Sequence, residues 1–425
     1  MNSQRSMRIL SVCSYYKPAY VYGGPVPSVA SLCEELVRGG AQVTVFTTNA
    51  NRGAPLDVPL QEPADVDGVT VWYFPLVLNG LSYFYSPSLA EAVSAQVPEF
   101  DLVVANTLWG HALIPTATAC ARFQVPYVVA VHGQLNPWAL AKKGLKKSIY
   151  LNVLGRRYVN HAAAIHCTDP IEAEAVQRLG FRPPTFVVPF AVHASSYSNI
   201  QKHGNLRRQF GIPDHAYVLL FLGRITQIKR PDIAVDTLGA VQSLNREIHL
   251  VLVGPDEDEL MPRLQAQARS LGCHNKLHFT GLLKKEAVIS ALAEASLLLM
   301  PSEVQENFGM AALEAMAVGV PVLVSGGVPV GRWAQMAGAG RIVACTKDAF
   351  QQAALELLSR SEQLRIMGRR GQDLVREHFD VSVVARQMLA QYQAIVTTGR
   401  PLPRTGFDFT SNCSTNSSAD RPGAI

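Results

Sequence analysis

The sequence predicts an α/β protein made of two Rossmann-like domains with parallel sheets. Its 425 residues are too many for one ordinary hydrophobic core and suit two domains of roughly 200 residues each. Short β-branched runs alternate with helical stretches along the chain, which is typical of βαβ units. The polar segment 193–204 lacks hydrophobic periodicity, and a second series of the same kind follows it. We therefore expect domains at residues 1–192 and 205–380, with their sheets facing a cleft between them.

The apolar runs place the individual elements. In the first half, strands are expected at 8–15, 42–47, 69–74, 102–105, 127–131, 163–167 and 186–189. In the second half, they are expected at 217–222, 249–253, 277–280, 297–300 and 320–324. Helices are expected at 28–38, 311–318, 361–370 and 381–395. The last helix, taken to residue 396, is long enough to pack back onto the N-terminal domain. Residues 397–425 are rich in Ser, Thr, Asn and Pro, so we expect a disordered tail.

The composition argues against several classes of function. No run approaches the ~18 apolar residues that a membrane-spanning helix needs, and Tyr15-Tyr-Lys-Pro follows the first apolar run instead of a cleavage site. The seven cysteines form no CxxC pair, which argues against disulfides or zinc. A net charge of +5 does not indicate nucleic acid as a partner. We expect a cytoplasmic protein, with the inner face of the membrane as a further location.

Two basic residues follow the first strand of the second series. Gly223-Arg224 ends this strand, Lys229 lies five residues further on, and Pro231 stands where a helix would begin. Two cations beside the positive end of a helix dipole can bind a diphosphate. The alternative is an ordinary solvated basic loop.

A second group of residues follows the expected strand at 297–300. Glu306 lies in the loop, Gly309 opens the next helix, and Glu314 lies within that helix. Free amides at a glycine-opened helix can bind an anion, and the spacing of the two carboxylates suits hydrogen bonds to two different sets of hydroxyls. The alternative is an amphipathic helix with two exposed glutamates, which does not explain an otherwise apolar helix containing Glu314.

These elements resemble the family 4 (group 1) retaining glycosyltransferases of GT-B fold. The likeness rests on Glu306-x7-Glu314 with Asn307-Phe-Gly, on Gly223-Arg224-x4-Lys229 and on Gly23-Gly24, and it extends to about residue 396. It implies that Arg224 and Lys229 hold the donor diphosphate, that Glu306 contacts the transferred sugar and that Glu314 binds the ribose. It also implies backbone contacts from Phe308, Gly309 and Met310, an acceptor-binding N-terminal domain and a nucleotide-sugar-binding C-terminal domain.

The N-terminal half offers weaker candidates. Gly23-Gly24 precedes the first expected helix, where backbone could approach phosphate or acceptor, although a plain turn explains the pair equally well. His132-Gly133 follows the strand at 127–131, and a lone histidine is more often structural than catalytic. With Gln134-Leu-Asn-Pro-Trp138 it resembles family members of surface-polysaccharide assembly, which implies that His132 contacts the donor sugar. Thr168 and Asp169 end another strand and receive no definite role.

The segment from Lys142 to Arg157 interleaves basic and apolar residues. Such a surface could touch anionic lipid or a polyprenyl-diphosphate acceptor, and a solvated helix face is equally consistent with the pattern. The acidic runs Asp65-Val-Asp67 and Asp256–Glu259 suggest a turn and a surface loop, because neither comes with the rest of a metal site. We expect no metal and no cofactor.

The chain also departs from its relatives. Where they often read Val-Ile-Pro-Asn-Gly-Val-Asp, this chain has Val188-Pro-Phe190-Ala-Val-His193, and the loop 326–332 lacks the frequent acidic residue. These positions border the expected cleft, so recognition of the acceptor is the least defined part of the site.

The function expected from these residues is transfer of a sugar from a UDP, GDP or ADP sugar to a glycan or lipid-linked glycan acceptor, with retention of anomeric configuration. One alternative is a sugar-nucleotide 2-epimerase of the same fold, which needs cleft acids and bases that we do not find. The other is a non-catalytic nucleotide-binding homologue, against which the intact Glu306-x7-Glu314 element counts.

Overall fold

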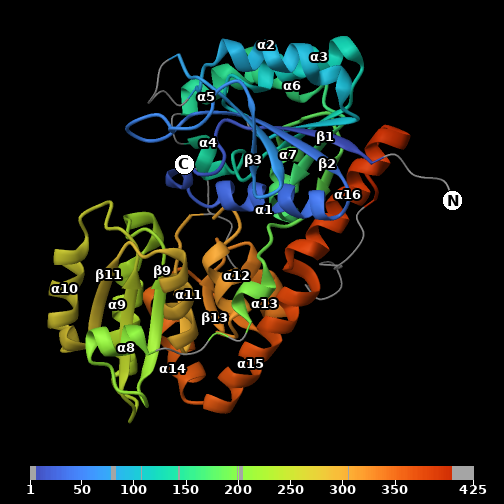
Figure 1. Cartoon of the computed structure of the whole chain (residues 1–425). Coiled ribbons are helices and arrows are strands. Elements are labelled where there is room, and N and C mark those ends of the chain that lie inside the picture. Colours follow the sequence, from blue (N-terminus) through green and yellow to red (C-terminus); the bar gives the residue numbers. More distant parts are fainter. Residues whose placement is uncertain are drawn as a thin grey trace, which may run out of the picture.

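A computed structural model describes residues 6–77, 83–106, 108–141, 144–198, 200, 204–304 and 306–403. Two α/β domains lie one above the other, each built around its own sheet (Figure 1). The strands of the first sheet come from residues 8–187 and those of the second from residues 217–343. The predicted fold class is confirmed. Residues 404–425 of the expected tail lie outside the described part of the chain.

The N-terminal sheet has eight strands in the order β3-β4-β2-β1-β5-β6-β7-β8, and all neighbours are parallel except β3 and β4. Its strands are β1 (Arg8–Val12), β2 (Gln42–Thr48), β3 (Pro63–Val66), β4 (Val69–Phe74), β5 (Leu102–Ala105), β6 (Tyr127–Ala130), β7 (Ala164–Cys167) and β8 (Thr185–Val187). The helices of this half are α1 (Pro25–Arg38), α2 (Pro87–Gln96), α3 (Leu113–Phe123), α4 (Pro137–Ala141), α5 (Gly144–Tyr150), α6 (Arg156–Val159) and α7 (Pro170–Arg178). Short 3-10 or π turns are η1 (Tyr20–Tyr22), η2 (Val97–Glu99) and η3 (Leu151–Gly155).

The C-terminal sheet has six parallel strands in the order β11-β10-β9-β12-β13-β14. Its strands are β9 (Tyr217–Leu222), β10 (Ile248–Val253), β11 (Leu277–Gly281), β12 (Leu297–Met300), β13 (Val322–Ser325) and β14 (Gly340–Val343). Its helices are α8 (Asn205–Phe210), α9 (Pro231–Val241), α10 (Met261–Ser270), α11 (Lys285–Glu294), α12 (Met310–Ala317), α13 (Val330–Met336), α14 (Lys347–Leu358) and α15 (Ser361–Leu374). The short turns are η4 (Ala194–Tyr197), η5 (Gln227–Lys229), η6 (His274–Lys276) and η7 (Val375–Phe379).

Each strand expected from the sequence overlaps a strand of the structure, and two strands were missed. β3 contains Pro63 and Asp65, which are poor strand formers, and it pairs antiparallel to β4 at the sheet edge, where both are tolerated. The turn expected at Asp65-Val-Asp67 before a strand is present but shorter, because Asp65 and Val66 belong to β3 and the turn is formed by Asp67 and Gly68, whose amide donates to Asp65 at 3.2 Å. β14 has only four residues and begins with Gly340.

The first helix begins three residues earlier than expected. α1 starts at Pro25, with Gly24 at its N-cap position. Proline lacks an amide hydrogen and has a fixed φ, so it suits the first turn of a helix, where the amides have no helical partner. Gly23 and Gly24 therefore stand directly at the start of α1.

The chain crosses between the domains twice, and the two crossings lie side by side. The Val192 amide donates to the Phe379 carbonyl at 2.9 Å, and the Val381 amide donates to the Val192 carbonyl at 3.0 Å. After the second crossing, α16 (Val381–Thr398) contacts α1 and runs along the N-terminal domain (Figure 1). Val384, Met388, Tyr392 and Ile395 belong to the same apolar cluster as the N-terminal strands. Within the described residues, every helix is too short or too polar to cross a bilayer.

Two histidines meet where β10 and β11 pair, near the beginning of the strands. His249 Nδ1 lies 2.9 Å from His278 Nε2, and His249 Nε2 lies 3.2 Å from a Glu247 carboxylate oxygen. Burial, together with the neighbouring His249, lowers the pKa of His278 to about 4. His278 therefore stays neutral in the folded protein over a pH range in which it would be protonated in the unfolded chain.

We expect His278 to make folding stability depend on pH. Below about pH 6.5 the unfolded chain binds a proton at this side chain, whereas the folded protein binds it only near pH 4, so stability falls as the pH drops through this window. Between pH 7 and pH 5, the melting temperature of His278→Gln should fall less than that of the wild type. His274→Gln, which changes an exposed histidine of η6, should behave as the wild type does. Parallel pH curves for wild type and His278→Gln would contradict this assignment.

Candidate active site

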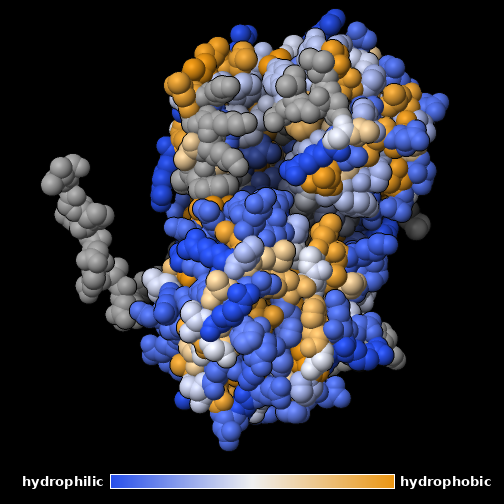
Figure 2. All heavy atoms as spheres, turned by 90° about the vertical axis from the view of Figure 1, so that its left-hand side faces the viewer, coloured by the Kyte–Doolittle hydropathy of each residue, from blue (hydrophilic) through white to orange (hydrophobic). Residues whose placement is uncertain are grey.

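The loops that follow the strands of both sheets meet at the boundary between the domains. The Thr168 hydroxyl, after β7, lies 3.5 Å from the Asn307 carbonyl oxygen, after β12. A Cβ atom added to Gly24 would lie 4.0 Å from the side chain of Met310. Parallel strands bring their carboxyl ends to one edge of each sheet, and ligands of such sheets bind at that edge. Figure 2 looks onto the side of the molecule where the surface is hollowed between the two domains.

Lys229 and Glu306 are brought together in this region. The Lys229 Nζ atom lies 2.5 Å from Glu306 Oε1, and the Ser302 hydroxyl donates to the same oxygen at 2.5 Å. Both side chains of the ion pair are only 16% exposed. Such a pair loses most of its hydration, and additional hydrogen bonds such as the one from Ser302 offset that loss. The site thus holds one cation and one carboxylate that neutralise each other.

Arg224 stands on the same loop but has a different partner. Its guanidinium donates to Glu257 at 2.7 Å, and the side chain is 53% exposed. The acidic run 256–259 forms the opposing loop, as the sequence predicts, and Asp256 accepts hydrogen bonds from the first amides of α10. Arg224 uses one of its five N–H donors on Glu257 and remains half-exposed, so an anion can bind its other donors.

The helix after Glu306 begins directly after a glycine, and any other residue at that position would displace neighbouring side chains. Gly309 has φ of 99°, and a Cβ atom there would lie 2.5 Å from Val328 Cγ1. Phe308 is buried before it, and Met310 is the first residue of α12. The start of α12 therefore has no side-chain cap, and Gly309 places no side chain before its first amides.

Glu314 lies in the second turn of α12 and is held by a residue between the domains. The Tyr197 hydroxyl donates to Glu314 Oε1 at 3.2 Å. Burial raises the pKa of Glu314 above its ordinary value. Tyr197 is itself buried and belongs to η4, so this carboxylate is linked to the segment that joins the two domains.

His132 is a buried, neutral histidine. Its Nε2 atom lies 3.0 Å from Asn106 Oδ1, and the Asn106 amide donates to Ser11, so the histidine proton resides on Nε2. Its Nδ1 atom has no hydrogen-bond partner among the described residues and can accept one. Burial, with a contribution from His166, lowers the pKa of His132 to about 3. It can therefore orient a hydroxyl but is a poor general base.

Phe190, one of the positions where this chain differs from the family pattern, has a structural role. Its ring stacks on His132 with a centroid distance of 5.6 Å and meets the edge of Phe308 at 5.9 Å. His132 belongs to the N-terminal half of the site and Phe308 to the C-terminal half, so the aromatic ring of Phe190 fills the space between them.

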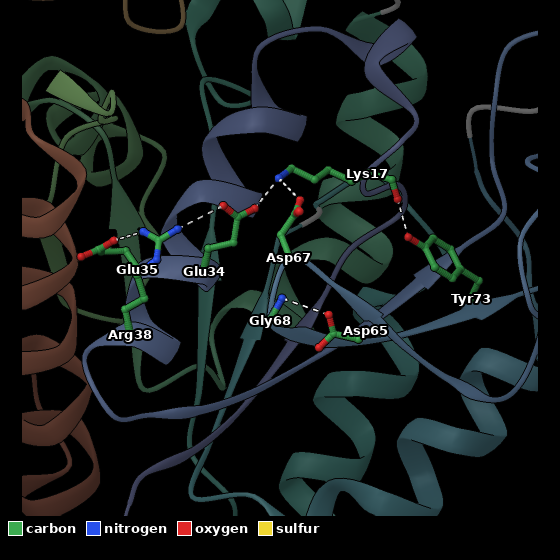
Figure 3. Close-up of polar contacts among 8 residues, drawn as sticks. All are labelled: Lys17, Glu34, Glu35, Arg38, Asp65, Asp67, Gly68 and Tyr73. Carbon is green, nitrogen blue, oxygen red and sulfur yellow. Dashed lines mark hydrogen bonds and ion pairs between the residues drawn. The ribbon is translucent and has the colours of Figure 1, made fainter. Parts of the chain in front are cut away.

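The loop that carries Gly23 and Gly24 is anchored by an ion cluster (Figure 3). Lys17 donates to Glu34 in α1 and, at 2.8 Å, to Asp67 in the turn before β4. The Tyr73 hydroxyl donates to the Lys17 carbonyl at 2.5 Å. The hydrogen bond from Lys17 lowers the pKa of Asp67. Gly23 and Gly24 are exposed at the end of a loop whose base is fixed.

Three residues around the site escaped the sequence analysis. Ser302 holds Glu306, Tyr197 holds Glu314, and Glu172 accepts hydrogen bonds from the Gly133 and Thr168 amides. A signal for Glu172 exists, since Asp169-x-x-Glu172 has the spacing of a capping box. That pattern predicts only a local hydrogen bond at the start of a helix, and it does not indicate a contact with Gly133.

Two family models match the sequence. Residues 23–191 match the glycosyl transferase 4-like domain, and residues 203–374 match the group 1 glycosyl transferases. The chain belongs to the family 4, group 1 glycosyltransferases. The phosphatidyl-myo-inositol mannosyltransferase of Mycobacterium leprae is 26% identical to this glycosyltransferase over 397 residues, which are 92% of this chain and 98% of the relative. The D-inositol 3-phosphate glycosyltransferase of Segniliparus rotundus is 29% identical over 399 residues, 90% and 86% of the two chains.

Solved structures share the fold. The Anabaena protein Alr3699/HepE in complex with UDP and glucose superposes with a TM-score of 0.70 at 20% identity, over 91% of this chain and all of the other. WaaG, a glycosyltransferase involved in lipopolysaccharide biosynthesis, superposes with a TM-score of 0.63 at 18% identity, over 92% and 100% of the two chains. The glycosyltransferase therefore has the two-domain GT-B architecture.

We expect Lys229→Ala and Glu306→Ala to lower turnover of this glycosyltransferase by at least about 100-fold, because each removes a group that the site positions by an ion pair. Both variants should remain folded, as circular dichroism and thermal unfolding would show. Arg341→Ala, which breaks the more exposed pair with Glu356 between β14 and α14, is the control and should leave turnover unchanged. Turnover at the wild-type rate in either site variant would refute this site.

Proposed function

We propose that this glycosyltransferase moves a sugar from a nucleoside-diphosphate sugar to an acceptor hydroxyl, with retention of anomeric configuration, in polysaccharide or glycoconjugate biosynthesis. The observation that carries the proposal is the buried pair of Lys229 and Glu306 beside the glycine-opened start of α12. A diphosphate suits a cation next to free helix amides, and a sugar suits a carboxylate that accepts hydrogen bonds. Solved relatives of the fold contain UDP or UDP-glucose, and one relative is named a GDP-mannose-dependent enzyme.

The reaction breaks the bond between the anomeric carbon and the diphosphate oxygen and forms one to the acceptor oxygen. Negative charge develops on the departing diphosphate, and Lys229, Arg224 and the start of α12 would stabilise it electrostatically. These protein groups supply the positive charge in the proposal, with no resident metal ion. Activity should therefore survive dialysis against EDTA.

Retention is proposed to occur by attack on the same face as departure, with the acceptor proton passing to the leaving diphosphate oxygen. Glu306 is engaged by Lys229 and Ser302, and Glu314 by Tyr197. Carboxylates held in this way are poor nucleophiles and good hydrogen-bond acceptors, which argues against a covalent intermediate on either. His132 would accept a hydroxyl hydrogen bond from the donor sugar at Nδ1 once a rearrangement exposes this buried nitrogen, which lacks a partner among the described residues.

A donor screen tests this function and separates it from the epimerase alternative. Thermal-shift measurements against UDP, GDP and ADP should show stabilisation by one of them, because a ligand that binds only the folded state raises its stability. Incubation of the matching sugar nucleotide without acceptor should then release free sugar slowly. Conversion to an epimeric sugar nucleotide would instead favour the 2-epimerase, and binding without any turnover would favour a non-catalytic homologue.

We further propose that the N-terminal domain lies against an anionic membrane that carries a lipid-linked glycan acceptor. Leu145, Ile149 and Val153, from α5 and η3, are 78%, 55% and 66% exposed at a spacing of four residues, so they lie on one side of the helical segment. Exposed Arg157 follows in α6, whereas Lys142 and Lys143 lie outside the described residues. α5 lies on the side of the domain that Figure 2 turns toward the viewer, where apolar side chains (orange) are visible. An apolar stripe near basic residues suits the interface of an anionic bilayer.

Replacement of Leu145, Ile149 and Val153 together by Ser should reduce co-sedimentation with phosphatidylglycerol-containing vesicles by at least about fivefold, because the apolar area that enters the lipid interface is lost. Leu282→Ser is the control, since Leu282 is 79% exposed in the C-terminal domain. Wild-type protein that stays in the supernatant would contradict the membrane contact, and so would equal binding by the triple variant.

A further inference from the structure

Glu172 is a carboxylate buried completely in the N-terminal domain, with an exposed fraction of 0%. One of its oxygens accepts a hydrogen bond from the Gly133 amide. The other accepts from the Thr168 amide at 2.6 Å and from the Thr168 hydroxyl at 3.0 Å. One side chain thus connects the loop after β6 with the loop after β7.

Both of these loops touch the donor side of the cleft at the same residue. A Cβ atom on Gly133 would lie 2.2 Å from Asn307 Oδ1, so the backbone there is in close contact with Asn307. Thr168 Oγ1 lies 3.5 Å from the Asn307 carbonyl oxygen. Asn307 directly follows Glu306, and Gly133 directly follows His132. One hydrogen bond of Glu172 therefore ends on Gly133, next to His132, and the others end on Thr168, which contacts the residue next to Glu306.

The local structure of α7 accounts for the Thr168 contacts of Glu172 but not for its bond with Gly133. Asp169 already caps this helix, because its carboxylate accepts from the Ile171 and Glu172 amides at 2.7 and 3.1 Å. No ion pair to a cation offsets the charge of Glu172 among the described residues, and burial raises its pKa to about 7. A buried carboxylate without a cation is costly, and capping the start of α7 does not require the additional hydrogen bond from Gly133. The free-energy cost of burying this carboxylate is explained if its three hydrogen bonds hold the loops that line the cleft.

We propose that Glu172 is a positioning residue of the transfer reaction. Its carboxylate fixes the ends of β6 and β7 against the backbone of Asn307 and so sets His132 relative to Glu306. This inference rests on the proposed function, because His132 and Glu306 act on the sugar only in that reaction. Arg224 and Lys229 lie outside this arrangement, in the C-terminal domain.

The variant Glu172→Gln tests the assignment. Glutamine has one acceptor oxygen where two are needed, so its amide group must face either the Gly133 or the Thr168 amide as donor against donor. We expect kcat for release of sugar from the donor found in the screen, chosen among UDP-glucose, GDP-mannose and ADP-glucose, to fall by about tenfold or more. The Kd of the free nucleoside diphosphate should stay within about twofold, because that ligand is held by the C-terminal domain.

Two controls separate positioning from general destabilisation. Glu294→Gln alters another buried carboxylate, which accepts from the Leu206 and Arg207 amides at the start of α8. In Figure 1, α8 lies at the lower left of the C-terminal domain, away from the N-terminal domain. It should lower the melting temperature but leave kcat unchanged. Thr168→Val should lower kcat, and Thr168→Ser, which keeps the hydroxyl, should restore it; this pair decides the matter even if Glu172→Gln fails to fold.

The outcomes distinguish this inference from the function on which it rests. Wild-type kcat in Glu172→Gln, or equal rates in Thr168→Val and Thr168→Ser, would overturn the positioning role while the wild type remains a transferase. A parallel loss of kcat in Glu294→Gln would also overturn it. Failure of the wild type to turn over any of the three donors would overturn the proposed function itself.

Discussion

The parallel direction of the strands is the constraint on which the site depends. Every strand of the C-terminal sheet runs parallel to its neighbours, and β3 and β4 form the one antiparallel pair among the described strands of the N-terminal sheet. The loops that follow β6, β7, β9 and β12 are far apart in sequence, yet they reach the domain boundary because their strands end at the same edges. The close approach of Gly133 to Asn307 then determines how near the two edges lie. A side chain at Gly133 would hold the halves of the site apart.

The charged groups proposed to bind the donor already have partners within the chain. Lys229 is paired with Glu306, Arg224 with Glu257, and Glu314 accepts from Tyr197. A ligand that takes one of these groups from its partner gains less than the new contact alone would suggest. The anionic groups of a ligand can bind the cations, and its hydroxyl groups can donate hydrogen bonds to the carboxylates that lose their partners. This requirement favours a sugar nucleotide over a simple phosphate.

The sequence predicted those parts of the site that lie within one strand, loop and helix. Arg224 and Lys229 follow β9, and Glu306, Gly309 and Glu314 surround the start of α12, so the expected strands and helix were enough to place these candidates at the ends of strands. Ser302 lies in the same loop, but serine is too common for its spacing to be informative. Tyr197 and Glu172 act on residues 117 and 39 positions away, and such contacts depend on how the domains and strands pack. The edge strand β3 was missed because tertiary pairing overrides the poor strand propensity of Pro63 and Asp65.

The double crossing near Val192 and Phe379 has a consequence for how the molecule can be divided. Residues of α16 complete the apolar core of the N-terminal domain, although they come after the entire C-terminal domain in sequence. A chain cut at residue 200 would leave the N-terminal half with an open hydrophobic face that only the far end of the polypeptide can cover. During synthesis, the N-terminal domain can therefore complete its apolar core only after the C-terminal domain and α16 have been translated.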